Sequence, residues 1–309
     1  MIVIRRYVIL KEYLQSALKG KKADYIEIRV QKSHNNILEY QGKELDRIDS
    51  SDNYGGCVRA FFKGGVGFVS FNNMDDISDK VDLAITQAQL VGKRIPDKTN
   101  FAEVEPIVDY VYADLRDDPF SISLTRKKEL LEEYNDIILS YGNPIASSRI
   151  SYFDNFTTLY YINNQGTYIE QEKVDLGGNI VALATDENTT QMSRVGFGGG
   201  DDFGVVRELH DKVKVACDKA VKMINAKPIT GGKYPVILDP TLAGVFVHEA
   251  FGHLSESDHI YENKKLQEIM QLGTKFGGEH LNIYDTGNAS GARGYLKYDD
   301  EGVPTQKLI

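Results

Sequence analysis

The chain has 309 residues, 41% of them hydrophobic and 26% charged, a balance typical of a globular protein with a sizeable core. Its 45 acidic and 36 basic side chains give a net charge of −9, which disfavours binding to nucleic acids and anionic membranes. No apolar run reaches the ~18 residues of a membrane-spanning helix. The two cysteines, Cys57 and Cys217, fit a reducing cytosol better than a disulfide scaffold.

The first part of the chain is predicted to contain helices at both ends of a group of strands. An amphipathic pattern over residues 1–20 predicts a helix rather than a signal peptide. Residues 24–71 are expected to form several short strands, with a turn at 63–65, and apolar spacing predicts a second helix over 77–91. A polar linker is expected to follow, marked by Pro96, Pro106 and Pro119.

The second part has the same mixture of elements. The expected helices have apolar residues three or four positions apart and lie at 121–141 and 205–225. The expected strands are short and rich in apolar residues: 157–163, 167–174, 180–185 and a buried strand at 234–238. Asp239 followed by Pro240 is typical of a helix start.

This order of elements predicts an α+β fold, because groups of strands alternate with single helices. We expect an N-terminal α/β sheet domain over residues 1–118. A β-rich domain that carries a motif helix is expected over residues 119–309.

A glycine-rich run at 196–200 has the composition of a phosphate-binding loop. However, Asp201 and Asp202 follow it directly, and neither a dinucleotide nor a Gly-Lys-Ser/Thr pattern is present. We therefore interpret the run as a plain turn, or else as a flexible loop that faces a substrate.

The chemistry of the sequence is concentrated at His248, Glu249 and His253. They form a His-Glu-x-x-x-His motif, one residue longer than the His-Glu-x-x-His signature of zinc peptidases. In a regular helix, residues four apart lie about 40° from each other around the axis, and residues five apart about 140°. Both histidines can therefore bind one ion only if the helix is distorted. A π-bulge would absorb the extra residue, and Gly252 would supply backbone freedom for it.

The residues around the motif decide between a metal site and two ordinary histidines, which could be hydrogen-bonded core or surface residues. Glu249 stands where zinc peptidases carry their general base. Glu256 and Asp258 could orient the imidazoles or serve as substitute ligands. The apolar segment 242–247 would bury this charged cluster, and buried ionisable groups need partners or a metal.

With these residues in place, the sequence resembles the TldD branch of the TldD/PmbA metallopeptidase family, formerly described as modulators of DNA gyrase. The resemblance lies in residues 225–240 and in the histidine motif with its following acidic residues. Residues 299–306 match a further family stretch, and 23–25 and 64–68 fit the N-terminal domain of the family.

The resemblance implies a cytoplasmic, zinc-dependent peptidase that acts on unfolded or leader peptides. It implies zinc binding by His248 and His253, with Glu249 activating water. The implied partner is a homologous TldE/PmbA-like subunit that lacks the histidine motif, so the pair would form a heterodimer.

The resemblance also implies a third zinc ligand, a cysteine that would lie beyond Ile309 in a chain that is C-terminally short. Cys57 and Cys217 do not match its position, and both are expected to pack in the protein interior. Glu256 or Asp258 could take its place. Two other functions stay open: a non-catalytic or truncated peptide-binding or assembly subunit, and a nucleic-acid or gyrase-binding module. The net charge of −9 disfavours the last.

Overall fold

The computed structural model describes residues 2–95 and 102–308, which divide into two compact units. Unit 1 contains the residues up to 226 together with 289–304, and unit 2 contains 227–288 and the residues from 305 onward. The division expected at residue 118 stays a prediction, and strands from both sides of it pair in one sheet. The fold combines helices with an antiparallel sheet, so the predicted α+β class is confirmed.

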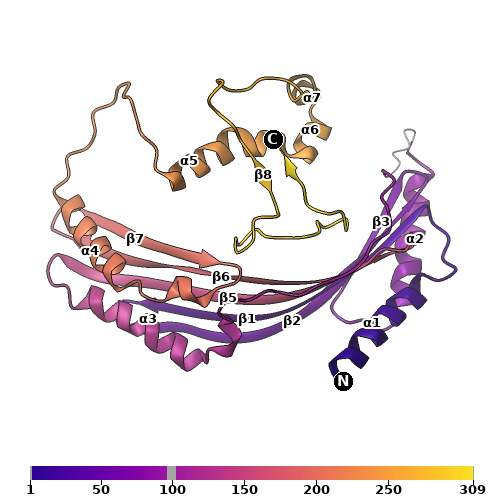
Figure 1. The fold of residues 1–309 in the computed structure, drawn as a ribbon, viewed down its shortest axis with the longest axis horizontal. Helices are drawn as coiled ribbons and strands as arrows, with labels where there is room; N and C mark the ends of the chain where they lie inside the picture. Colours follow the sequence, from indigo (N-terminus) through magenta and orange to yellow (C-terminus); the bar gives the residue numbers. More distant parts are fainter. Residues whose placement is uncertain (1, 96–101, 309) are drawn as a thin grey trace. The chain divides into compact units, whose positions relative to one another are not determined.

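Unit 1 is built on a seven-stranded sheet with the order β3-β2-β1-β5-β6-β4, in which β7 also pairs with β6 (Figure 1). All neighbours are antiparallel except β4 and β6, which are parallel. The strands are β1 (Tyr25–Gln41), β2 (Glu44–Phe62), β3 (Gly65–Phe71), β4 (Val108–Val111), β5 (Ile145–Asn163), β6 (Tyr168–Thr185) and β7 (Thr190–Gly199).

The strands are longer than the sequence pattern suggested. Four of them have 17 to 19 residues, so the several short strands expected over 24–71 are wrong in number and length. The polar linker contains β4, which pairs with the start of β6. Pro96 lies outside the described residues. The expected turn at 63–65 is confirmed, because Lys63 and Gly64 both have left-handed backbone angles (φ 48° and 81°).

Four helices cover one face of this sheet: α1 (Ile2–Leu18), α2 (Ile77–Gly92), α3 (Leu124–Leu139) and α4 (His210–Ile224). Alternate residues of β1, from Ile26 to Tyr40, point towards them and enter two hydrophobic cores. One core lies under α1 and α2, and the other under α3 and α4 (Figure 1). A Cβ at Gly67 would lie 1.8 Å from the Ala84 carbonyl oxygen, so only glycine lets α2 approach β3 so closely.

A buried ion pair lies on the helix-covered face. Lys127 Nζ of α3 is 2.5 Å from Asp154 Oδ2 of β5, and the two side chains are 2% and 0% exposed. Tyr152 donates to the same carboxylate oxygen at 2.5 Å, and Asn36 donates to the other oxygen at 2.8 Å. The Asp154 carboxylate is therefore fully partnered away from water, as a buried charge requires.

Residues 289–304, here called the strap, cross the opposite face of the sheet. Arg293 donates two hydrogen bonds to Asp175, at 2.6 and 3.1 Å. Further along, Gln171 accepts the backbone N–H of Tyr298 at 3.0 Å and donates to its carbonyl oxygen at 3.2 Å. At the end of the strap, Glu301 lies 3.2 Å from a guanidinium nitrogen of Arg59. The strap is thus attached to the sheet of unit 1 along its length.

The glycine-rich run belongs to this attachment rather than to a phosphate-binding loop. Residues 196–199 form the end of β7, so the expected turn is wrong for most of the run. A Cβ at Gly198 would lie 2.8 Å from the Arg293 side chain, and one at Gly200 would lie 2.8 Å from the Ala292 carbonyl oxygen. The small residues make room for the strap.

Unit 2 is made of short elements, none longer than eight residues among those described. They are α5 (Pro240–Val247), a π-helical turn η3 (His248–Gly252), the 3-10 turn η4 (His253–Ser255), α6 (Ser257–Glu262), α7 (Lys264–Ile269), β8 (Asp285–Thr286) and β9 (Lys307–Leu308). The buried strand expected at 234–238 is wrong, because Val236 and Ile237 are 73% and 101% exposed and have no strand partner among the described residues. No helix in the described part of the chain has the length and apolarity to cross a membrane.

Candidate metal centre

The helix that carries the motif begins as the sequence predicts. The Asp239 side chain accepts the backbone N–H of Leu242 at 2.8 Å, and Pro240 occupies the first helical position. Both are favoured at helix starts, since the carboxylate satisfies a free N–H and proline lacks one. Helix α5 then runs to Val247 and places His248 at its end.

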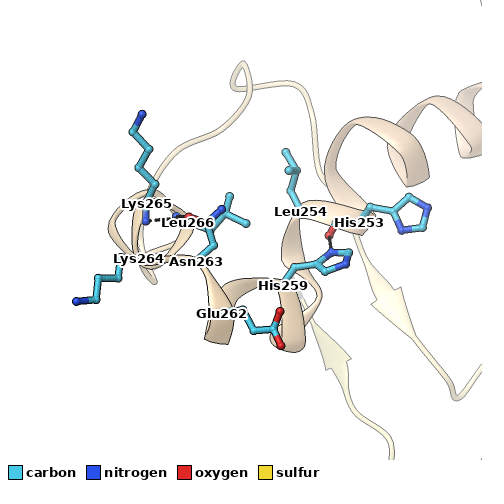
Figure 2. Close-up of a pocket in the computed structure, with 8 residues that line it drawn as sticks. All are labelled: His253, Leu254, His259, Glu262, Asn263, Lys264, Lys265 and Leu266. Atoms are coloured by element: carbon cyan, nitrogen blue, oxygen red, sulfur yellow. Dashed lines mark hydrogen bonds between the residues drawn. The ribbon is translucent and has the colours of Figure 1, made fainter.

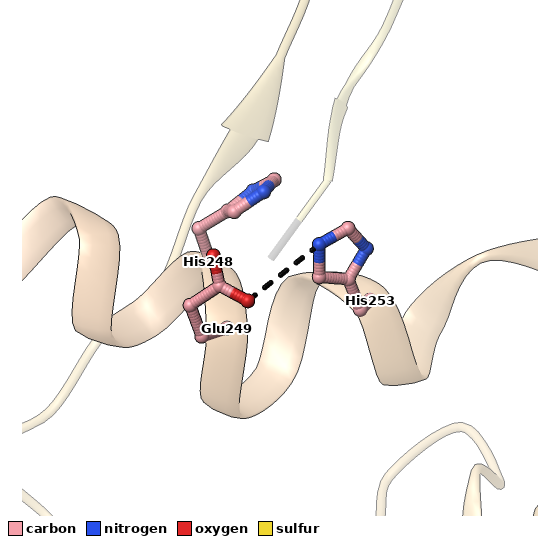
Figure 3. A group of neighbouring side chains, drawn as sticks. All are labelled: His248, Glu249 and His253. Carbon is pink, nitrogen blue, oxygen red and sulfur yellow. Dashed lines mark ion pairs between the residues drawn. The ribbon is translucent and has the colours of Figure 1, made fainter.

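The motif itself forms a π-helical turn. Residues His248–Gly252 are π-helical, and the His253 N–H donates to the carbonyl oxygen of His248, five residues earlier. This turn absorbs the extra residue and brings the two imidazoles together, with ring centroids 4.4 Å apart at an interplanar angle of 60° (Figure 3). The distortion that the spacing requires is therefore present.

The expectation that Gly252 supplies backbone freedom for the π-turn is wrong. Its backbone angles, φ −53° and ψ −55°, are those of an ordinary right-handed helix, which any residue can adopt. A Cβ at this position would lie 3.5 Å from His248 Nδ1, an ordinary van der Waals contact. The π-turn therefore does not depend on glycine backbone freedom.

His248, Glu249 and His253 offer three ligand atoms that lie within 4.8 Å of one another. His253 Nε2 is 3.8 Å from Glu249 Oε2 (Figure 3). Imidazole nitrogens are among the ligands that zinc takes in proteins, and His248 and His253 offer two of them within reach of one ion. The Glu249 carboxylate lies beside these two nitrogens, close enough to face a water molecule bound at the same point. The residues fit a zinc ion.

Glu256 acts on His253 from the other side of the ring. Its Oε1 lies 2.7 Å from His253 Nδ1. Asp258 is placed differently, because its carboxylate accepts the backbone N–H of His259 at 2.9 Å. Of the two acidic residues singled out from the sequence, Glu256 thus contacts a motif imidazole, and the Asp258 carboxylate contacts the backbone of His259.

His259 is a neighbour of the motif that the sequence analysis did not single out, and its side chain is 56% exposed. Its Nδ1 donates to the His253 carbonyl oxygen at 3.1 Å and lies 3.3 Å from Glu256 Oε2. The hydrogen bond to this carbonyl, together with the charge of Asp258, raises the pKa of His259. The spacing of three residues from Glu256, across one turn of α6, was the available signal.

A hollow of about 630 Å³ lies beside these histidines (Figure 2). It is lined by His253, Leu254, His259, Glu262, Asn263, Lys264, Lys265 and Leu266. The side chains of Lys264 and Lys265 extend away from the two imidazoles. Asn263 is occupied in capping α7, where it accepts the N–H groups of Lys265 and Leu266. The lining therefore shows no converging set of polar groups.

The whole cluster is open to solvent. The side chains of His253 and Glu249 keep 47% and 65% of their surface exposed. The expectation that the apolar segment 242–247 would bury the cluster is wrong, because Leu242 and Phe246 are themselves 52% and 62% exposed. Hydrogen bonds and backbone geometry, rather than burial, hold these side chains.

Both cysteines lie in unit 1. Cys217 of α4 is fully buried in a hydrophobic core, as expected, and burial raises the pKa of its thiol to about 11. Cys57 of β2 is half-buried, and burial likewise raises the pKa of its thiol. A thiol binds metal as the thiolate, so neither environment favours a metal ligand.

Two imidazoles and an adjacent carboxylate that converge on a helix define the candidate centre of a metallohydrolase. Family models agree with this class along most of the chain. They match the PmbA/TldA metallopeptidase domain 1 at residues 26–88, the central domain at 117–224 and the C-terminal domain at 231–309. The chain belongs to the TldD/PmbA metallopeptidase family.

Individual relatives agree with this assignment. A metalloprotease of Synechocystis is 36% identical over 93% of this chain and 62% of its own length. A zinc metalloprotease TldD homolog of Saccharolobus solfataricus is 28% identical over 70% of this chain and 52% of its own length. The chain therefore spans less than two thirds of these relatives.

Solved structures share the fold. TldE from Thermococcus kodakarensis superposes with a TM-score of 0.70 over 96% of this chain and 66% of its own length, at 16% identity.

Proposed function

We propose that this chain is the catalytic subunit of a zinc-dependent peptidase of the TldD type, which hydrolyses unfolded or leader peptides. The observation that carries the proposal is the π-turn at His248–Gly252, which gathers two imidazoles and the Glu249 carboxylate around one point. The metalloprotease names of the relatives support the same class.

In this proposal His248 and His253 hold the metal. A bound zinc ion would supply Lewis-acid chemistry and lower the pKa of a water molecule at the site to about 7. Glu249 follows His248 directly, and its carboxylate faces His253 Nε2 at 3.8 Å. From there it would accept the proton of the attacking water and deliver it to the departing amine of the peptide.

The partner and the compartment belong to the same proposal. The likeness to a TldE structure supports pairing with a homologous TldE/PmbA-like subunit, and two unpaired cysteines fit a cytoplasmic protein. The net charge of −9 supports a peptide rather than a nucleic acid as the substrate.

The test compares the chain with its Glu249→Gln variant. Each would be loaded with zinc and incubated with an unstructured reporter peptide, alone and with a TldE-like subunit. We expect Glu249→Gln to retain zinc and to lose turnover by about 10²–10⁴-fold, as expected for removal of a general base. Glu279→Gln is the matched control, because Glu279 lies in unit 2 with 85% of its side chain exposed.

Two outcomes would contradict the proposal. The first is turnover that survives in Glu249→Gln. The second is a parent chain that binds the homologous subunit but takes up no zinc, which would indicate a non-catalytic peptide-binding or assembly subunit.

A further inference from the structure

We infer that Glu256 is the positioning residue of the proposed metal site. It fixes the tautomer and the direction of the His253 ring, so that Nε2 is the nitrogen offered to the cation. The role of Glu256 in metal binding rests on the proposed function, but its effect on the tautomer of His253 can be tested in the metal-free chain.

The hydrogen-bond partners of His253 assign the roles of its two nitrogens. Nδ1 lies 2.7 Å from Glu256 Oε1, and a carboxylate can only accept, so Nδ1 carries the proton. The lone pair is then on Nε2, which faces Glu249 and the His248 ring. Carboxylates that bind the far nitrogen of a ligating imidazole set its orientation and raise its basicity in many zinc sites.

An ordinary structural role for Glu256 does not explain this contact. Glu256 stands at the N-cap position of α6, where shorter side chains such as Asp or Ser commonly accept a backbone N–H of the helix. Here it makes no such capping bond. Both of its oxygens instead face imidazoles, Oε1 that of His253 and Oε2 that of His259 at 3.3 Å.

His259 supports the same arrangement through the backbone of His253. Because its Nδ1 donates to the carbonyl oxygen of His253, it holds the backbone that carries the ring (Figure 2). Glu256, Asp258 and His259 also form a group close enough to hold a cation themselves. However, the Nδ1 of His259 and the Oε1 of Glu256 are already engaged in these hydrogen bonds. The geometry therefore favours a positioning role for these residues over a second metal site.

The experiment uses the 309-residue chain with ¹⁵N-labelled histidine and three variants: Glu256→Ala, Glu256→Gln and Glu279→Gln. Ring ¹⁵N spectra of the metal-free proteins report the tautomer of His253, and zinc titration against a chelator reports affinity. We expect Glu256→Ala to lose the Nδ1–H preference and to bind zinc about 10–100-fold more weakly. Glu256→Gln retains an acceptor oxygen and should keep the tautomer with a smaller loss of affinity.

Glu279→Gln is the matched control, since it makes the same chemical change at a side chain of unit 2 that is 85% exposed and pairs with Lys275. It should leave both the tautomer and the affinity unchanged. A Glu256→Ala variant with an unchanged His253 tautomer, or a Glu279→Gln variant with an equal loss, would overturn the inference. A parent chain that binds no zinc but shows the expected tautomers would instead overturn the proposed function alone.

Discussion

The two units hold their charged side chains in opposite ways. In unit 1, Lys127 and Asp154 are almost completely buried, and each oxygen of the carboxylate has a partner in the core. In unit 2, no residue from 227 to 288 is buried, and the cluster at His248 and Glu249 is exposed. Unit 1 therefore fixes its polar groups by packing, and unit 2 fixes them by local hydrogen bonds and one π-turn.

Because of this difference, the charged groups of unit 1 are expected to affect the stability of the fold, and those of the exposed cluster in unit 2 are expected to affect cation binding. A buried ion pair costs much desolvation, so loss of one partner is severe, whereas exposed pairs contribute little. An exposed set of ligands contributes little to folding by itself. A cation bound by it would stabilise the folded chain through mass action. Substitutions in the two units should therefore have different signatures.

The largest effect is expected for Lys127→Met. It leaves Asp154 charged and buried with two neutral partners, so the free energy of unfolding should fall by about 3–5 kcal/mol. Urea unfolding followed by circular dichroism measures this loss.

The neighbouring residue supplies the control. Lys128 pairs with Glu132 one turn along α3 with 33% of its side chain exposed, so Lys128→Met should cost no more than about 0.5 kcal/mol. Asp154→Asn added to Lys127→Met should restore part of the lost stability, because the buried charge is then removed. Equal losses in Lys127→Met and Lys128→Met would refute the account of unit 1.

A smaller effect is expected for Gly302→Ala in the strap. Gly302 has a left-handed φ of +73°, and a Cβ there would lie 2.6 Å from the Tyr161 ring. We expect a loss of about 1–3 kcal/mol in the free energy of unfolding. Gly294→Ala in the same strap meets no atom within 4 Å and should cost nothing. Zinc affinity should be equal in both variants, and a selective loss in Gly302→Ala would show that the site depends on the strap.

The smallest effect concerns Cys217 and pH. Burial raises the pKa of this thiol to about 11 in the folded chain, whereas an unfolded thiol titrates near 8.5–9. Between these values the unfolded chain releases a proton that the folded chain keeps, so stability falls as the pH rises. From pH 8 to pH 10 the parent should lose about 1–2 kcal/mol more than Cys217→Ala. Parallel pH profiles would contradict the burial of the thiol.

The sequence predicted the local features of the site well. The start of the motif helix at Asp239 and Pro240 follows from capping chemistry, and the need for a distorted turn follows from helix geometry alone. Both depend on a few neighbouring residues. The part given to Gly252 was wrong because a π-turn changes hydrogen bonding while its backbone angles stay helical.

Features that depend on distant partners could not be predicted. The run at 234–238 is apolar enough for a strand, but a strand needs a second strand beside it. The glycines at 196–200 are explained only by the strap, which follows about ninety residues later. The role of His259 required the path of the chain between η4 and α6, which brings its ring under the His253 carbonyl.

The central claim is that the π-turn directs His248 and His253 to one cation. X-ray absorption at the zinc K-edge of the zinc-loaded 309-residue chain tests it most directly. We predict one bound zinc per chain with two imidazole nitrogens at ~2.0–2.1 Å, and a loss of one imidazole or of the metal in both His248→Ala and His253→Ala. His280→Ala should leave the spectrum unchanged. A spectrum without imidazole ligands, or one that neither motif variant alters, would contradict the account.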